Sequence, residues 1–103
     1  MVHHIVMWNF KKEIPEEKKP ELKAEMEKQL GSLVGKVPGL LTVDFVKEPL
    51  PSSTHEIALV TTMEKAEDVA VYGNHPAHVA VADTYVRPYV CDRACLDYVA
   101  QEV

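Results

Sequence analysis

The first segment of the chain, residues 2–10, is apolar on both of its faces. Large side chains occupy every second position and share one face of an extended segment, namely His4, Val6, Trp8 and Phe10. Ile5 and Met7 lie on the opposite face. This pattern predicts a β-strand that is covered on both sides. The helices of one small domain, residues 1–103, can cover one side only, so the other side needs a separate partner.

Two further regions carry helix signals. The first is predicted to run from Ile14 to Gly35, because acidic residues occupy its first turn and an apolar stripe follows, made of Leu22, Met26, Leu30 and Leu33. The second is interrupted, and its parts are a helix over 65–72, a break at Gly73-Asn74 and a second piece from Pro76 to about Val86.

The remaining strands are predicted over 40–48, 55–63 and 90–99, and the first of them places Leu41, Val43 and Phe45 on one face. The order is therefore β-α-β-β-α-β, which is typical of an α+β domain of the ferredoxin-like kind. Such a domain has a four-stranded antiparallel sheet with two helices on one face. Its bare, partly apolar face predicts a two-fold homodimer.

The amino-acid composition excludes some classes of function. The net charge of −5 argues against nucleic acid as a partner, and no apolar run is long enough for a membrane span. Cys91 and Cys95 would lie about 13 Å apart along one strand, too far for a disulfide. We expect them to be small, reduced core residues of a cytoplasmic protein.

The sequence predicts neither a cofactor nor a transition metal. The cysteines are not spaced as a zinc pair, His3 and His4 point to opposite faces of a strand, and no phosphate loop or flavin, nicotinamide or haem motif occurs. We expect the chain to fold without metal. Arg93 could form a structural ion pair with Asp92 or Asp97.

Histidines and tyrosines cluster in the second helical region. Pro76 fits the first position of a helix, which places His78 in the first turn and His75 just before it, while Tyr72 can point back toward His78. A neutral histidine beside a tyrosine can move a proton near pH 7. We therefore predict one pocket between the helices and the sheet. Its predicted catalytic residues are His78 and Tyr72, and its predicted walls are Trp8, Phe10 and His75. The alternative is that His78 packs under the sheet with both ring nitrogens satisfied, and that His4 only contacts a dimer partner.

Three sequence blocks resemble the stress-responsive A/B barrel family, whose members are small dimeric α+β barrels. The blocks are His4-x-Val6-x-x-x-Phe10-Lys11, Tyr72-x-x-His75-Pro76-x-His78-Val79 and Asp92-Arg93-x-x-x-Asp97-Tyr98, and they span essentially the whole chain. The resemblance implies that two four-stranded sheets close into one barrel. Some plant members of the family hold a magnesium ion through backbone carbonyls, and the matching positions here are Val34, Val37 and Leu40.

Plant polyketide cyclases that resemble this family use a histidine base and a tyrosine for an aldol-type ring closure, and these two residues fall on His78 and Tyr72. The first-strand histidine of the cyclases falls on His4, so the resemblance implies His4 as a third catalytic residue. The chain departs from the cyclases at Ile57, where they have a histidine, and at Trp8, whose bulk could fill the pocket. Two main hypotheses follow. The chain is either a barrel that binds a small apolar or phenolic molecule with no assigned activity, or a cofactor-free proton-transfer enzyme of the cyclase kind. A monooxygenase of the dimeric-barrel type is a third option.

Overall fold

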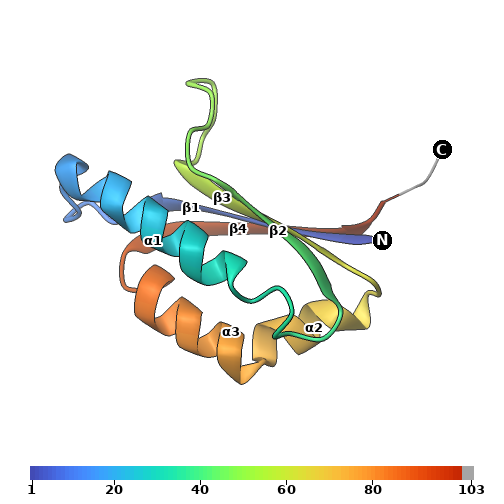
Figure 1. Cartoon of the computed structure of the whole chain (residues 1–103). Coiled ribbons are helices and arrows are strands. Elements are labelled where there is room, and N and C mark those ends of the chain that lie inside the picture. Colours follow the sequence, from blue (N-terminus) through green and yellow to red (C-terminus); the bar gives the residue numbers. More distant parts are fainter. Residues whose placement is uncertain (101–103) are drawn as a thin grey trace.

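The computed structural model describes residues 1–100 and shows the predicted order of strands and helices (Figure 1). The elements are β1 (Val2–Phe10), α1 (Lys19–Gly31), β2 (Leu40–Val46), β3 (Ile57–Met63), α2 (Glu67–Asn74), α3 (Pro76–Val81) and β4 (Val90–Val99). One 3-10 turn, Glu16–Lys18, precedes α1, and one π-helical turn, Ala82–Val86, extends α3. The strands form one antiparallel sheet in the order β2-β3-β1-β4, which confirms the ferredoxin-like fold class.

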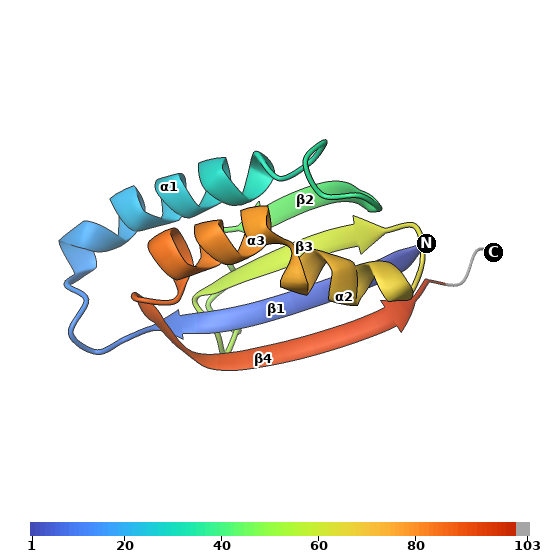
Figure 2. The same ribbon diagram turned by 90° about the horizontal axis from the view of Figure 1, so that it is seen from below.

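The helices cover one face of the sheet (Figure 2). The core lies between them, and burial alternates along β1 as the sequence predicted, since every even position from Val2 to Phe10 is buried. The opposite face carries no helix. On it Tyr98 stacks on His3 with ring centroids 5.1 Å apart, and Leu96 is 60% exposed. No helix within residues 1–100 is long and apolar enough to cross a membrane.

The first helix is shorter than predicted. It begins at Lys19, so that Pro20 falls in the first turn, where a missing N–H group leaves no hydrogen bond unmade. It ends at Gly31, four residues before the predicted end at Gly35. The chain continues through turns to β2, and Gly35 lies in these turns with φ +89°.

The break in the second helical region lies at His75. Gly73 and Asn74 belong to the last turn of α2, and His75 is extended with φ −66° and ψ 132°. The cause is Pro76, because the ring of a proline disfavours helical geometry in the residue before it. His75 then caps α3, as its Nδ1 accepts a hydrogen bond of 3.1 Å from the Ala77 N–H.

Two bulges change the predicted strand patterns. The register between β2 and β3 shifts between Leu40 and Thr42, so Leu40 is buried and Leu41 is exposed, against the predicted pattern. A second shift lies between Met7 and Asn9, opposite a part of β4 where Asp92 has φ 55°. The loop between β2 and β3 is also longer than predicted, since it runs from residue 47 to residue 56.

The cysteines were wrongly predicted to be core residues. Cys91 is partly exposed and Cys95 is exposed, and both are free thiols. The reason is that β4 is an edge strand of the sheet, so its side chains have fewer neighbours than those of β1 and β3.

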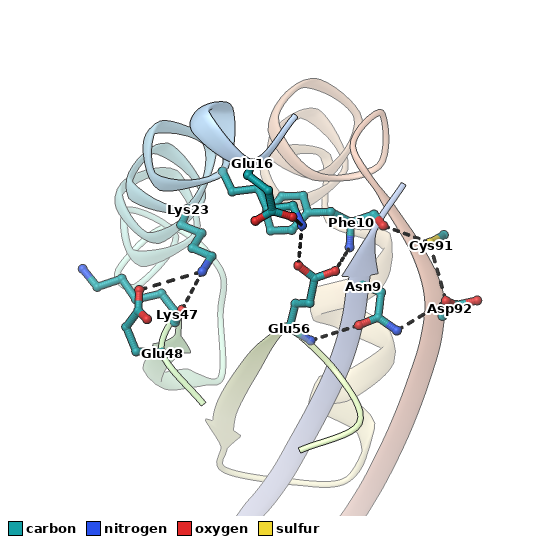
Figure 3. A network of polar contacts seen from close by, with 10 residues as sticks. Asn9, Phe10, Glu16, Lys23, Lys47, Glu48, Glu56, Cys91 and Asp92 are labelled. Atoms are coloured by element: carbon teal, nitrogen blue, oxygen red, sulfur yellow. Dashed lines mark hydrogen bonds and ion pairs between the residues drawn. The ribbon is translucent and has the colours of Figure 1, made fainter. Parts of the chain in front are cut away.

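A polar network holds the C-terminal end of β1 (Figure 3). Glu56 lies at its centre, just before β3 begins. The Glu56 carboxylate accepts hydrogen bonds from the Phe10 N–H at 3.2 Å and from the Lys19 ammonium at 2.8 Å. The Glu56 N–H donates to the Asn9 side chain at 3.0 Å. Hydrogen bonds from the Lys19 ammonium to Glu16 and then to Glu56 raise the pKa of Lys19.

Candidate functional site

A cavity of about 290 Å³ lies between the sheet and the helices. Its floor is formed by β1 and β4, and its opposite wall by α2, α3 and the π-helical turn. Its polar or aromatic lining residues are His4, Trp8, Tyr72, His78, Arg87, Arg93, Cys95 and Asp97, and most of the rest are aliphatic. The cavity is therefore an apolar chamber with a few titratable groups at its edge, which is typical of small-molecule sites.

Tyr72 contributes a phenol without a partner. Its side chain is almost fully buried in the last part of α2, and its hydroxyl has no hydrogen-bond partner within residues 1–100. Burial raises the pKa of Tyr72 to about 12, because the phenolate would lose its hydration. The hydroxyl therefore stays protonated and is available as a hydrogen-bond donor to a molecule in the cavity.

His78 lies in the first turn of α3, where Pro76 fixes the start of the helix. Its Nδ1 lies 3.1 Å from the carbonyl oxygen of Gly73. A carbonyl oxygen only accepts, so Nδ1 carries the proton, and in the neutral ring Nε2 keeps its lone pair. Burial lowers the pKa of His78, which favours this neutral form. The His78 and Tyr72 rings lie 4.2 Å apart at their centroids, tilted by 42°.

His4 belongs to a second group of polar side chains on the sheet. Its Nδ1 is in hydrogen-bond contact with Oδ1 of Asp97, and the ring meets the Tyr72 ring edge-on with centroids 6.0 Å apart. The Cys95 sulfur lies 3.8 Å from the same Nδ1. Burial, followed by the charge of Asp97, raises the pKa of the Cys95 thiol.

Four of the predicted site residues therefore lie around one cavity, namely His4, Trp8, Tyr72 and His78. Trp8 forms part of the wall and leaves the cavity open. Phe10 and His75 do not line the cavity, so their predicted place in its wall was wrong. Phe10 packs deeper in the core, with the Lys19 ammonium 5.4 Å from its ring centroid, and His75 is used as the cap of α3.

Three residues of β4 line the cavity although they were not predicted to lie there, namely Arg93, Cys95 and Asp97. They occupy every second position, so they share one face of the strand. This alternation in the sequence could have predicted that they lie together. Arg93 forms no ion pair with Asp92 or Asp97 within residues 1–100, which corrects the predicted pairing. The side chain of Arg93 lines the cavity instead. Its positive charge lies near Cys95 and opposes the rise in the pKa of the Cys95 thiol.

Other predicted features lie away from the cavity. Ile57, where the cyclases have a histidine, is buried in the core. The nearby His55 lies in the loop before β3 and bonds to the Asp92 carbonyl at 3.1 Å. Of the carbonyls that the family resemblance suggested for magnesium, that of Val37 accepts a hydrogen bond of 3.3 Å from the Leu40 N–H.

Comparison with known proteins gives one family and several solved structures of similar fold. The sequence model of the Stress responsive A/B Barrel Domain matches residues 2–100. No curated protein matches the chain significantly in sequence. A dimeric protein of unknown function with a ferredoxin-like fold, from Bacteroides fragilis, is 28% identical with a TM-score of 0.84, and the match covers 94% of this chain and 93% of that one.

Two plant structures are also similar. A protein from Arabidopsis thaliana is 25% identical with a TM-score of 0.77, over 100% of this chain and 98% of its own. The hydroxynitrile lyase from Passiflora edulis is 18% identical with a TM-score of 0.73, over 99% of this chain and 94% of its own. At that identity the lyase is similar to this chain in fold alone.

Proposed function

Since the chain belongs to the stress-responsive A/B barrel domain family, we propose that it binds a small apolar or phenolic molecule in the cavity beside His78 and Tyr72. The unpartnered hydroxyl of Tyr72 carries this proposal. A buried hydroxyl without a partner costs about 1–3 kcal/mol, and an oxygen atom of a bound molecule would offset that cost. The aliphatic walls would hold the rest of the molecule.

The size of the cavity limits what binds. Its volume of about 290 Å³ is at the lower end of ligand cavities, which span roughly 300–1,000 Å³. Trp8 lines this volume on the sheet side. A molecule with a single substituted ring fits this volume better than a molecule with several fused rings.

A second candidate function is proton transfer. It is favoured by Nε2 of His78, which has no hydrogen-bond partner among the described residues 1–100. In such a reaction Nε2 takes a proton from a carbon next to a carbonyl group, and the electron pair of that C–H bond forms an enolate. The Tyr72 hydroxyl donates a hydrogen bond to the oxygen on which the negative charge develops. His78 needs no cofactor for this step.

We also propose that the chain is a homodimer. The Bacteroides fragilis structure is described as dimeric, and the helix-free face of this sheet exposes Leu96 and Tyr98. Pairing two such faces would bury both sets of apolar side chains. The free thiols of Cys91 and Cys95 support a reducing location, the cytoplasm.

The only tryptophan, Trp8, provides the test of ligand binding, because it lines the cavity. We expect 4-hydroxyacetophenone, a phenol with a carbonyl group, to change the fluorescence of Trp8 until the site is saturated. Tyr72→Phe should weaken binding roughly three- to tenfold, the effect of one hydrogen bond. Tyr85→Phe is the matched control, since Tyr85 is half-buried and does not line the cavity. Equal binding by Tyr72→Phe would place the site elsewhere.

The same compound tests proton transfer, because its methyl protons lie next to the carbonyl group. In deuterated water, the wild type should speed the exchange of these protons for deuterium, as seen by proton NMR, and His78→Ala should not. If the compound binds but its protons exchange no faster, proton transfer is ruled out and ligand binding is the one function that remains. Unfolding of His78→Ala would instead assign His78 a structural role.

A further inference from the structure

The group of polar side chains on the floor of the cavity lies beside the Tyr72–His78 pair, since the His4 and Tyr72 rings meet edge-on. We propose that His4, Cys95 and Asp97 form a binding site for a divalent transition cation, for which zinc is the best match. This site does not depend on the function proposed for His78 and Tyr72.

The three possible ligand atoms converge on one point. The Cys95 sulfur lies 3.8 Å from Nδ1 of His4 and 3.7 Å from Oδ1 of Asp97, and Nδ1 and Oδ1 are in hydrogen-bond contact. Zinc bonds of about 2.3 Å to sulfur and 2.0–2.1 Å to nitrogen and oxygen put two tetrahedral ligands about 3.3–3.6 Å apart. The two sulfur distances nearly fit already. The His4–Asp97 contact has to open, which is possible because the Asp97 side chain is 42% exposed.

The register of the sheet explains why these residues meet. His4 of β1 pairs directly with Asp97 of β4, and the next position on the same face pairs Val6 with Cys95. Two ligands therefore come from alternate positions of one strand and the third from its neighbour. The hydrogen-bond ladder holds both backbones, so the three side chains are brought together before a cation arrives, and only the Asp97 side chain has to move.

The chemistry of the donors selects the cation. A thiolate, an imidazole and a carboxylate suit zinc, whereas magnesium and calcium prefer oxygen ligands alone. The two negative donors balance a divalent charge. Arg93 is the opposing feature, because its positive charge lies near Cys95. Removing that charge should strengthen cation binding.

The site would leave one coordination position open. Three protein ligands and an open fourth position are typical of catalytic zinc sites, in contrast to closed structural ones. His4, Cys95 and Asp97 all line the cavity, so the open position is accessible to a molecule bound there. An oxygen atom of that molecule would complete the coordination sphere.

Cobalt(II) is the probe for this site, because it replaces zinc and reports a thiolate ligand by an intense absorption band in the near ultraviolet. The full chain is first freed of metal with a chelator and dialysed. Titration with cobalt should then produce the band with one ion per chain, and zinc should remove it. Cys95→Ser should lose the band, Asp97→Asn should weaken cobalt binding by more than about tenfold, and Arg93→Gln should strengthen it.

Cys91→Ser is the matched control. Cys91 is also on β4 and also contacts a carboxylate, with its sulfur 3.6 Å from Asp92, but its other contact is the Phe10 carbonyl (Figure 3). This variant should keep the band. The proposal is overturned if the wild type gives no band, if the band survives in Cys95→Ser, or if it disappears in Cys91→Ser. Should Cys95→Ser fail to fold by circular dichroism, unchanged cobalt affinity in Asp97→Asn would overturn the proposal.

Discussion

The centroids of the His78 and Tyr72 rings lie 4.2 Å apart at the same cavity, and each ring carries one polar group without a hydrogen-bond partner within residues 1–100. For His78 that group is Nε2, since Nδ1 is bonded to the Gly73 carbonyl. For Tyr72 it is the buried hydroxyl. The pair thus combines a proton acceptor with a proton donor, and burial favours the neutral form of both.

Stability should depend on pH through His78. Burial lowers the pKa of His78 from its ordinary value of 6.5, so between the folded and unfolded pKa values the unfolded chain binds more protons. The free energy of unfolding should therefore fall as the pH decreases through 6.5 toward the folded pKa. Urea unfolding between about pH 5 and pH 8 should show a smaller decrease in His78→Gln. The control His55→Gln, in an exposed loop, should keep the wild-type profile, and an equal decrease in all three proteins would contradict the prediction.

Leu96→Asp should convert the proposed dimer to a monomer. Leu96 lies on the helix-free face and is 60% exposed, and a buried aspartate at the interface would lack a partner. Size-exclusion chromatography with light scattering measures the mass. The matched control is Val71→Asp, which changes a 42% exposed apolar residue of α2. A wild-type monomer at micromolar concentration would refute the dimer.

Gly39→Ala should destabilise the fold far more than Gly35→Ala. Both glycines have positive φ, +82° and +89°, which costs an alanine roughly 1–2 kcal/mol. At Gly39 a Cβ atom would also lie 2.3 Å from Cγ of the buried Asp68, whereas nothing lies within 4 Å at Gly35. We expect a loss above about 3 kcal/mol for Gly39→Ala in urea unfolding. Equal losses would show that Asp68 moves aside freely.

Glu56→Ala should cost about 1–2 kcal/mol, because it leaves the Phe10 N–H without its acceptor and removes one partner of Lys19. Glu16→Ala is the control. Glu16 is the other partner of Lys19, but its side chain is 86% exposed, so its loss should cost less than about 0.5 kcal/mol. The measurement is the free energy of unfolding of both variants in urea. A larger effect for Glu16→Ala would assign the stability to the exposed ion pair.

Removal of metal should leave the chain folded. The backbones that carry His4, Cys95 and Asp97 are held by the ladder between β1 and β4, which needs no cation. Melting with a strong chelator should stay cooperative, with a midpoint within about 5 °C of the untreated protein. Loss of the cooperative transition would show that a metal is required for folding, as in zinc fingers.

The sequence by itself determined the fold class and the placement of His78 beside Tyr72. Alternation along residues 2–10 identified β1 and its buried face, and Pro76 placed His78 in the first turn of a helix beside Tyr72. These features are local, because the period of a strand or helix and the geometry of proline are encoded within a few residues.

Only the tertiary structure decided which distant residues meet. His4 and Asp97 are separated by 93 positions, and they meet because the register between β1 and β4 pairs them directly. The bulge at Leu40 likewise buried a different leucine from the one that alternation favoured. A shift of one residue in register sends a side chain to the other face of the sheet. Register is set by cross-strand hydrogen bonds and packing, which the sequence pattern of one strand does not contain.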